Sequence, residues 1–222
     1  DITPDMCTEE PSVVMDKRDG QTYTIARLKD GKCWMTQDLI FGYDSSNPST
    51  TTITIAPEDT NTDVAKTMAV YDLVINGETE CQDNGYSVSC AHYGINSSGK
   101  KTAWYNFAMM TGYTVSNDIP GSTGKDAEYD ICPKGWRLPT LNEGEALAAS
   151  GDRDNFGPTY NGGYWYGQLH NNGTWSYYET STIYNDTKQN VIFVFSDGRF
   201  GAGYVNVNRH DGLSTRCLLK ES

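Results

Sequence analysis

The stretch ICPKGWRLPTLNE, residues 131–143, is dense in residues that restrict the backbone or fill a core. Two prolines fix the backbone angle φ, and Trp136 supplies a large ring for packing. Arg137 is expected to satisfy buried carbonyls or a carboxylate rather than a ligand. The stretch therefore indicates architecture more than chemistry.

The second half of the stretch predicts the start of a helix. Thr140 and Glu143 have the Ser/Thr-x-x-Glu spacing of a capping box. Pro139 prevents the helix from extending backwards, and Gly151 supplies a stop. A short helix is therefore expected to run to about Ala149.

The residues near the N-terminus read as strands. Asp-Gly steps at Asp19 and Asp30 bracket QTYTIARLK, residues 21–29, whose β-branched and aromatic residues suit a strand. These flanks favour tight type I′ hairpins. With SVVMDK before it and KCWMT after it, this region predicts a three-stranded meander.

At about residues 42–101 the composition shifts to Ser, Thr, Asn and Asp, with one apolar island, MAVYDLVI. We expect a long insertion with little regular structure, because this segment is too large for a simple connection. After it, AWYNFAMMTG predicts a helix that ends at Gly112. One face of this helix would carry Trp104, either Phe107 or Ala108, and Thr111.

Further strands are expected near the C-terminus. NVIFVF, residues 190–195, is a continuous apolar run, as in a strand covered on both faces, and the turn at Asp197 leads into RFGAGYVNV. In LSTRCLL, residues 213–219, alternate residues from Leu213 onward would share one face. This order predicts the α+β class, with antiparallel sheets, two short helices and long loops, in a single domain over residues 1–222.

The six cysteines form an even set without a Cys-x-x-Cys pair and without histidine at ligand spacing. This pattern favours disulfides over zinc, and therefore an exported protein that is extracellular or on the cell surface. Of the fifteen possible connectivities we expect these three: Cys7–Cys33, Cys81–Cys90 and Cys132–Cys217. The middle pair would close the short acidic loop CQDNGYSVSC.

Charge and hydropathy argue against two classes of partner. The chain has 17 basic and 29 acidic side chains, and the net charge of −12 repels nucleic-acid phosphates and anionic lipid. No stretch approaches the roughly 20 apolar residues of a membrane helix. We therefore expect no nucleic-acid partner and no membrane insertion within this chain. Any export signal or anchor is expected to lie outside this sequence, which starts at Asp1 without a leader.

Four blocks of the sequence together resemble a known family. DGQTYTIARLKDGKCWMTQDL, AWYNFAMMTG, CPKGWRLPTLNE and GLSTRCL look like successive blocks of the Fibrobacter succinogenes major paralogous domain, in family order and over nearly the whole chain. The resemblance implies a C-type-lectin-like fold in an exported bacterial surface protein. It also implies adjacent termini, two helices and a long loop region that serves display or recognition rather than a known reaction. The Cys132–Cys217 bond gains support, because both cysteines lie in these blocks.

One segment departs from the family pattern. Where the family has a tryptophan followed by Ser-Ser, this chain reads YYETST, with Glu179 at the aromatic position. Either the core there is rebuilt from Trp175, Tyr177 and Tyr178, or the segment faces solvent. Arg216, in the last block, is expected to satisfy buried carbonyls or a carboxylate.

The sequence shows no catalytic arrangement. It has no G-x-S-x-G elbow and no phosphate-binding glycine loop, its cysteines are expected to be oxidised, and its histidines, His92, His170 and His210, are dispersed. Paired carboxylates could cleave sugars, yet 29 acidic residues on an exported surface produce such pairs by chance. We expect a protein that is not an enzyme, with no catalytic residue and no cofactor other than a possible calcium ion.

Calcium is the metal that the acidic loops could hold. Asp152, Asp154 and Asn155 in GDRDN, or Asn185 and Asp186 in YND, carry the carboxylate and amide oxygens that this cation prefers. Neither group matches an EF-hand, and the sequence lacks the Glu-Pro-Asn and Gln-Pro-Asp triplets of sugar-binding C-type lectins. A solvated acidic loop is the alternative.

Aromatic residues between Tyr160 and Tyr184 are interleaved with Asn, Gly, Ser and Thr. Such a mixture is typical of recognition surfaces, because Tyr and Trp give large contact area at low entropic cost while Asn and Ser adapt their hydrogen bonds. Part of these rings would be needed for the core. The Asn-rich strand GYVNVNRHDG is expected beside them. The predicted ligand-binding residues are Trp165, Tyr166, Trp175, Tyr178, Asn206, Asn208 and Arg209.

Two hypotheses of function follow. The first is a non-enzymatic, exported recognition module that binds a glycan or a surface protein through these loops. The second is a structural subunit of a surface filament, pilus or coat, in which an edge strand and Ser/Thr-rich loops meet neighbouring copies by self-assembly.

Overall fold

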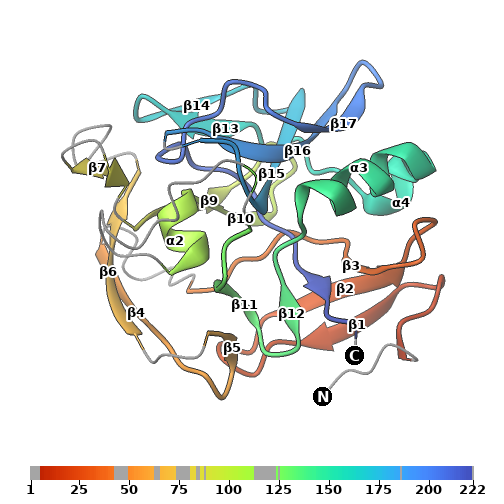
Figure 1. Cartoon of the computed structure of the whole chain (residues 1–222), viewed down its shortest axis with the longest axis horizontal. Helices are drawn as coiled ribbons and strands as arrows, with labels where there is room; N and C mark the ends of the chain where they lie inside the picture. The colour runs from red at the N-terminus through yellow and green to blue at the C-terminus, as the bar shows by residue number, and fades with distance from the viewer. Residues whose placement is uncertain are drawn as a thin grey trace.

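The computed structural model describes residues 6–42, 50–62, 66–73, 81–83, 86–87, 89–112, 124, 126–185 and 187–221. This part of the chain forms mostly antiparallel sheets with three short helices, an α+β arrangement. Figure 1 shows the N-terminal sheet at one end of the molecule and the sheets of the C-terminal half at the other.

The first sheet has five strands in the order β1-β2-β3-β18-β12. The predicted meander is confirmed: β1 (Ser12–Met15), β2 (Thr22–Arg27) and β3 (Cys33–Met35) pair in sequence, antiparallel. β18 (Leu218–Leu219) then pairs with both β3 and β12 (Trp136–Arg137). β18, near the C-terminus, thus joins the N-terminal meander to the strand that contains Trp136.

The two Asp-Gly steps lie in turns, but these are not the predicted type I′ turns. Gly20 and Gly31 have φ values of 74° and 82°, whereas neither Asp19 nor Asp30 has a positive φ. A type I′ turn needs positive φ at both central positions. Each aspartate instead accepts a hydrogen bond from the backbone N–H two residues further on, at 3.0 Å, which stabilises a longer turn.

The segment at 42–101 contains strands, so the expectation of little regular structure is wrong for its described part. Its four-stranded sheet has the order β10-β9-β6-β4. β9 (Cys90–Ile95) and β10 (Lys101–Tyr105) form a hairpin, and β6 (Lys66–Asp72) pairs with both β9 and β4 (Thr50–Ile55). Threonine-rich sequence suits this sheet because threonine is β-branched. The short strands nearby are β5 (Thr60–Asn61), β7 (Gln82–Asp83), β8 (Tyr86–Ser87) and β11 (Asp130–Pro133).

The AWYNFAMMTG segment is a strand followed by a helix, not a single helix. Trp104 belongs to β10, and α2 (Phe107–Thr111) starts only after Asn106. The Asn106 side chain accepts the N–H of Met109, which is the geometry that starts a helix rather than continues one. The predicted end is confirmed, because Gly112 adopts a left-handed φ of 67°.

The predicted capping box is confirmed. α3 (Leu141–Ser150) begins at Thr140, whose hydroxyl accepts the N–H of Glu143 while the Glu143 carboxylate accepts the N–H of Thr140. Arg137 donates to both Glu143 oxygens, at 2.5 and 2.7 Å. Burial raises the pKa of Glu143, but the hydrogen bonds from Arg137 and Thr140 outweigh burial and lower that pKa to about 2. A helix that the sequence did not predict, α4 (Arg153–Phe156), follows α3.

The C-terminal half supplies a three-stranded sheet and a hairpin. β15 (Trp175–Ile183), β16 (Gln189–Phe195) and β17 (Phe200–Gly203) are antiparallel neighbours, and α3 packs on them. β16 is buried on both faces, as its apolar run predicts. The hairpin of β13 (Gly163–Trp165) and β14 (Gln168–His170) lies at the same end of the molecule (Figure 1).

The LSTRCLL run does not alternate between a buried and an exposed face. All of residues 213–219 are buried, and only β18 is a regular strand. The run passes between elements of the interior: Leu213 bridges to Tyr105, and the Thr215 carbonyl accepts the N–H of Leu39. Arg216 lies on this run and, as expected, donates to Asp38 and to the carbonyls of Phe156 and Gly157 at the end of α4.

All three expected disulfides are present, and the structure contains no free cysteine. Cys7 bonds to Cys33, Cys81 to Cys90, and Cys132 to Cys217. Three disulfides indicate an oxidising, extracytoplasmic location. In the described part of the chain, no helix is long and apolar enough to cross a membrane.

Candidate functional site

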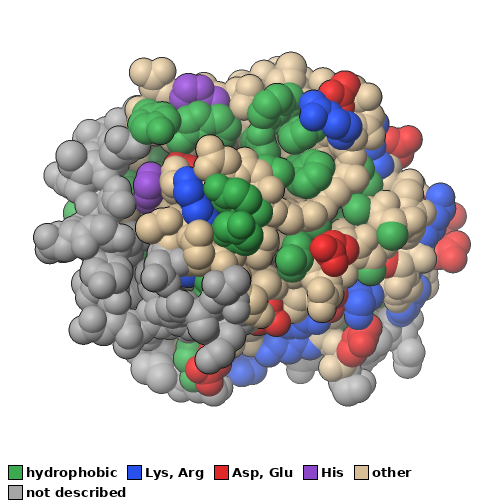
Figure 2. Space-filling view, turned by 45° about the horizontal axis from the view of Figure 1, so that its top comes forward, with side chains coloured by type: hydrophobic (Ala, Val, Ile, Leu, Met, Phe, Trp, Pro, Cys, Tyr) green, Lys and Arg blue, Asp and Glu red, His purple; other side chains and the backbone are tan. Residues whose placement is uncertain are grey.

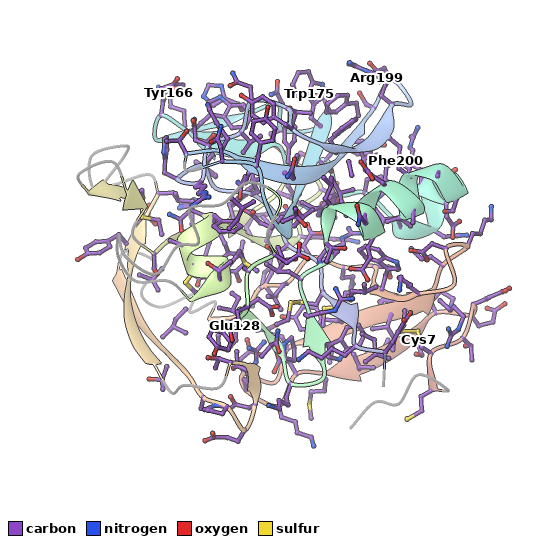
Figure 3. The ribbon with its side chains drawn as sticks, viewed as in Figure 1. Cys7, Glu128, Tyr166, Trp175, Arg199 and Phe200 are labelled. Carbon is purple, nitrogen blue, oxygen red and sulfur yellow. A yellow bond between two sulfur atoms is a disulfide. The ribbon has the colours of Figure 1, made fainter. Side chains whose placement is uncertain are left out.

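A cleft of about 320 Å³ lies between the β13–β14 hairpin and the segment that follows β17. Its aromatic side chains, which we call the aromatic wall, are Trp165, Tyr166, Trp175 and Tyr177, and its polar side chains, which we call the polar wall, are Lys188, Asn206, Asn208 and Asp211. Figure 2 brings this end of the molecule forward and shows hydrophobic side chains gathered over it, with charged and histidine side chains among them. Figure 3 shows Tyr166 and Trp175 at this end, directed outward.

The aromatic wall is held by ring contacts. Trp165 stacks on His170, with ring centroids 4.7 Å apart and planes 5° from parallel. Trp165 and Trp175 each meet Tyr177 edge to face, at 6.1 and 5.9 Å. Trp175 also lies 4.7 Å from the ring of Phe195. These contacts restrict the rings before a ligand arrives, which lowers the entropy that binding must remove.

Two residues of the cleft have an unusual backbone conformation. Tyr166 has a φ of 55° and Asn206 a φ of 63°, in the left-handed region that most L-residues avoid. Tyr166 and Gly167 form the tight turn between β13 and β14, both with positive φ. Tyr166 is 67% exposed and lines the cleft. Strained residues of this kind concentrate at functional sites.

The polar wall is a chain of hydrogen bonds centred on Lys188. Its ammonium donates to Asn206 Oδ1 at 3.1 Å and to Asn208 Oδ1 at 2.5 Å. Asn208 in turn donates through its backbone N–H and its side-chain amide to Asp211 Oδ2, at 2.7 and 3.1 Å. An ammonium has three donors, so one N–H of Lys188 remains for another acceptor. The wall can thus donate hydrogen bonds into the cleft.

A buried carboxyl group supports this wall from behind. Glu179, on β15, is fully buried, and its Oε1 lies 3.4 Å from the Gln189 amide, which also donates to the Asn208 carbonyl at 3.2 Å. Burial raises the pKa of Glu179 well above its usual value. The hydrogen bond from Gln189 opposes this shift, and the charge of Asp211 adds to it. The YYETST segment is therefore core, not solvent-facing, with Tyr177 and Tyr178 both buried beside Glu179.

Five of the seven predicted ligand-binding residues line the cleft: Trp165, Tyr166, Trp175, Asn206 and Asn208. The prediction is wrong for Tyr178, which is 0% exposed, packs edge to face on Phe156, and bonds through its hydroxyl to Thr159. Neighbouring residues of a strand point to opposite faces, so Tyr177 faces the cleft instead.

Arg209 is also not available to a ligand, because it is only 3% exposed. Its guanidinium donates to the carbonyl of Asn185 and lies over the ring of Phe107, 5.4 Å from the centroid. Arg209 therefore holds the Asn-rich segment in place from inside. The cleft lining also includes residues outside the predicted ligand-binding set: Tyr177, Lys188, Val205, Val207 and Asp211. Strand periodicity could have indicated Tyr177, whereas no sequence signal marks Lys188.

The three histidines lie in separate environments. His92 Nδ1 is 3.1 Å from Asp72, and the ring stacks on Trp104. His170 supports Trp165, as described above. His210 lies behind the cleft, where burial, together with the charge of Lys188, lowers the pKa of its imidazole. The structure does not bring these three rings together.

The predicted calcium ligands have other partners. The Asp152 carboxylate accepts the backbone N–H of Lys29 and the side-chain amide of Asn155, both at 2.8 Å, while Asp154 pairs with Arg153 on the surface. Among the residues that the structure describes, no group of three His, Cys, Asp or Glu side chains could hold a metal ion. Asp186 lies outside the described residues. Calcium binding stays a prediction of the sequence.

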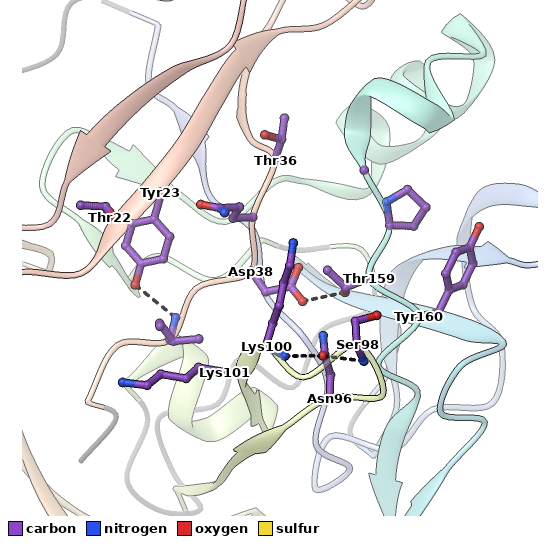
Figure 4. A pocket seen from close by; sticks show the side chains of 14 residues that line it. Thr22, Tyr23, Thr36, Asp38, Asn96, Ser98, Lys100, Lys101, Thr159 and Tyr160 are labelled. Carbon is purple, nitrogen blue, oxygen red and sulfur yellow. Dashed lines mark hydrogen bonds between the residues drawn. The ribbon is translucent and has the colours of Figure 1, made fainter. Parts of the chain in front are cut away.

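A second cavity, of about 380 Å³, lies between β2, the β9–β10 loop and the segment after α4 (Figure 4). It is lined mainly by hydroxyl, amide and lysine side chains, and Asp38 lies at its inner side. The Asp38 carboxylate already accepts hydrogen bonds from Arg216, Thr159 and Asn161, at 2.8, 2.7 and 2.6 Å. This cavity is slightly larger than the cleft, but its acidic group is satisfied within the protein and its aromatic lining is limited to Tyr23 and Tyr160.

Comparison with protein-family models, curated proteins and solved structures finds no match for this chain. The resemblance to the Fibrobacter domain therefore stays an expectation that depends on four sequence blocks.

Proposed function

We propose that this protein is a non-enzymatic, exported recognition module of C-type-lectin-like fold that binds a glycan in the aromatic cleft. The observation that carries the proposal is the pairing of two walls: the rings of Trp165 and Trp175 on one side, and Lys188, Asn206 and Asn208 on the other. The C–H groups of a sugar ring are weakly positive and are attracted to the negative face of an aromatic ring. Amide and ammonium groups bind its hydroxyls.

The shape of the site favours a small ligand over a protein surface. A specific protein partner usually buries about 800 Å² on each side, whereas small-molecule sites are concave and of roughly 300–1,000 Å³. The cleft, at about 320 Å³, is at the lower end of that range. Its donors and its fixed rings suit a ligand that presents hydroxyls at its edge and C–H groups on its face.

A glycan array probed with the folded protein tests this proposal. We expect Trp175→Ala and Lys188→Gln each to weaken binding to the selected glycan by about 10-fold or more, because each removes one wall of the cleft. Lys188→Gln is the milder variant, which guards against loss of folding. Tyr160→Ala, in the second cavity, is the control. Loss of binding with Tyr160→Ala alone would move the site to that cavity, and no glycan bound at all would overturn the proposal.

A second candidate function is a subunit of a surface filament, pilus or coat. β1 is the edge of the five-stranded sheet in the described part of the chain, and its Val13 and Met15 side chains are exposed. An exposed edge strand with apolar side chains can pair with another chain. Sedimentation at high protein concentration tests this: assembly that Val13→Lys abolishes would support it, and monomers at every concentration would exclude it.

A further inference from the structure

Two exposed tyrosines form a stacked pair next to the cleft. Tyr184 and Tyr204 have ring centroids 4.1 Å apart and planes 3° from parallel. They directly follow β15 and β17, the two strands that flank β16. Both residues are exposed, with exposed fractions of 38% and 39%. The pair thus forms a flat aromatic platform that the core does not use.

Asn206 connects this platform to the cleft. Its Oδ1 accepts the hydroxyl of Tyr204 at 2.8 Å and the ammonium of Lys188 at 3.1 Å. Tyr204 is also two residues before Asn206 in the chain, with Val205, another cleft residue, between them. The Tyr204 hydroxyl and the Lys188 ammonium therefore donate to the same oxygen atom.

Asn206 and Lys188, which connect the aromatic wall of the cleft to the Tyr184–Tyr204 pair, can still donate hydrogen bonds to a ligand. With Oδ1 of Asn206 occupied, the side-chain amide nitrogen points its two donors elsewhere, and among the described residues none accepts from it. Asn206 is exposed, and its left-handed φ of 63° holds it at this position. The third N–H of Lys188 adds to these donors.

We propose that the binding site continues from the cleft across Asn206 onto the Tyr184–Tyr204 pair, so that the ligand is an oligosaccharide that covers both aromatic surfaces. A chain of sugars presents a ring face, then a polar linkage, then another ring face. The molecule presents the complementary order: the Trp165–Trp175 wall, the donors of Asn206 and Lys188, and the tyrosine pair. This inference rests on the proposed function, because it takes the ligand to be a glycan.

The test uses the glycan that the array selects, shortened one sugar at a time, and measures its affinity for the wild type, Tyr204→Ala and Tyr204→Phe by calorimetry. We expect wild-type affinity to rise with length. Tyr204→Ala should weaken the longest ligand by about 3- to 10-fold and leave the shortest unchanged, because only the longer ligand reaches the platform. Tyr204→Phe keeps the stack and should retain more of the length dependence. Met15→Ala, at an exposed site on β1, is the control.

Tyr184→Ala tests the platform independently, because the stack needs both rings. This variant should also weaken the binding of long glycans and leave the affinity for the shortest unchanged. Affinity that does not change with length, or a Tyr204→Ala variant that weakens every length equally, would overturn the extended site while leaving glycan binding in the cleft intact. Failure of every array glycan to bind the wild type would instead overturn the proposed function itself, and the extension with it.

Discussion

At the scale of single residues, Tyr166 occupies a conformation that other residues adopt more easily. Its φ of 55° disfavours a bulky L-residue, whereas asparagine is common at this position of a type I′ turn. The ring is exposed and so gains little from packing. A tyrosine at this position is therefore a feature that folding alone does not explain.

Tyr166→Asn should raise the free energy of unfolding by about 0.5–1 kcal/mol and weaken glycan binding by about 3- to 10-fold. The two effects have opposite signs because the residue is strained in the free protein and, under the proposed function, its ring contacts the ligand. Urea unfolding and a glycan titration measure them. Asn171→Gly, at another left-handed position outside the cleft lining, should leave binding unchanged. A Tyr166→Asn variant that binds as tightly as the wild type would remove Tyr166 from the site.

Glu179 gives the protein a pH-dependent stability. Its pKa is raised well above the usual 4.5 by burial, so from about pH 4.5 upward the folded state holds a proton that the unfolded state has released. The free energy of unfolding then falls as pH rises towards the folded-state pKa, by at most about 1.4 kcal/mol per pH unit. Glutamine cannot ionise, and its carbonyl can still accept the hydrogen bond from Gln189.

We therefore expect Glu179→Gln to match the wild type near pH 4.5 and to be more stable at pH 8, as measured by urea unfolding at both values. Glu143→Gln is the matched control, and its effect on the free energy of unfolding has the opposite sign. The pKa of the wild-type Glu143 carboxyl is lowered to about 2, so the ionised carboxylate stabilises the fold above pH 4.5, and this contribution is lost as pH falls towards 2. That variant should lose about 1–2 kcal/mol at pH 8, after allowance for solvent screening. Equal pH profiles for wild type and Glu179→Gln would contradict the assignment.

At the scale of elements, α3 approaches the C-terminal sheet through a glycine. A Cβ at Gly144 would lie 2.6 Å from Ile192 Cγ1 and 2.9 Å from Ala202 Cβ, which is closer than atoms pack. In a sequence, glycine within a helix indicates a weak helix. In the structure it is the point of contact between α3 and β16 and β17.

Gly144→Ala should therefore lower the free energy of unfolding by about 1–2 kcal/mol, because the clash with Ile192 and Ala202 exceeds the gain of roughly 1 kcal/mol in helix propensity. Urea unfolding measures this loss. Asn142→Ala, on the exposed side of the same helix, has only the propensity effect and should raise stability by about 0.5 kcal/mol. If Gly144→Ala also proved stabilising, the close packing of α3 on the sheet would be refuted.

Element ends that depend on near neighbours in the chain were predictable from the sequence. The cap at Thr140 and the stop at Gly112 satisfy backbone groups within one turn. Trp104 differs, because its strand exists only through pairing with β9. That partner is the other strand of a hairpin and lies within the segment at 42–101, where the sequence predicted little regular structure, so the pairing was not predicted. The helix predicted at Trp104 was wrong for this reason.

The candidate site was predictable as a region but not residue by residue. The aromatic and Asn-rich segments that the sequence singled out meet at one end of the molecule, and five of the seven expected side chains line one cleft. Which of Tyr177 and Tyr178 faces that cleft depends on the register of β15 against β16, and a shift of one residue would exchange them. Lys188 is placed by the connection between the same two strands, so its role needs the fold.

At the scale of the whole molecule, the three disulfides differ in how far apart in the chain their cysteines lie. The sequence separations are 85 residues for Cys132–Cys217, 26 for Cys7–Cys33 and 9 for Cys81–Cys90. The longest loop joins β11 to the buried C-terminal run, and so links the middle of the chain to the five-stranded sheet. In the chain-entropy description, a cross-link restricts the unfolded state more as its loop grows.

Replacing both members of a pair by alanine should therefore destabilise the protein in the order of loop length. We expect a loss of about 4–5 kcal/mol for Cys132 with Cys217 and about 2–3 kcal/mol for Cys81 with Cys90, measured by urea unfolding without reductant. Typical domains have only about 5–15 kcal/mol in total, so the first variant loses a large part of its stability. The Cys81–Cys90 bond closes a short loop that ends at β9. Equal losses for both pairs would show that packing around the sulfur atoms, rather than restriction of the unfolded chain, is what these bonds contribute.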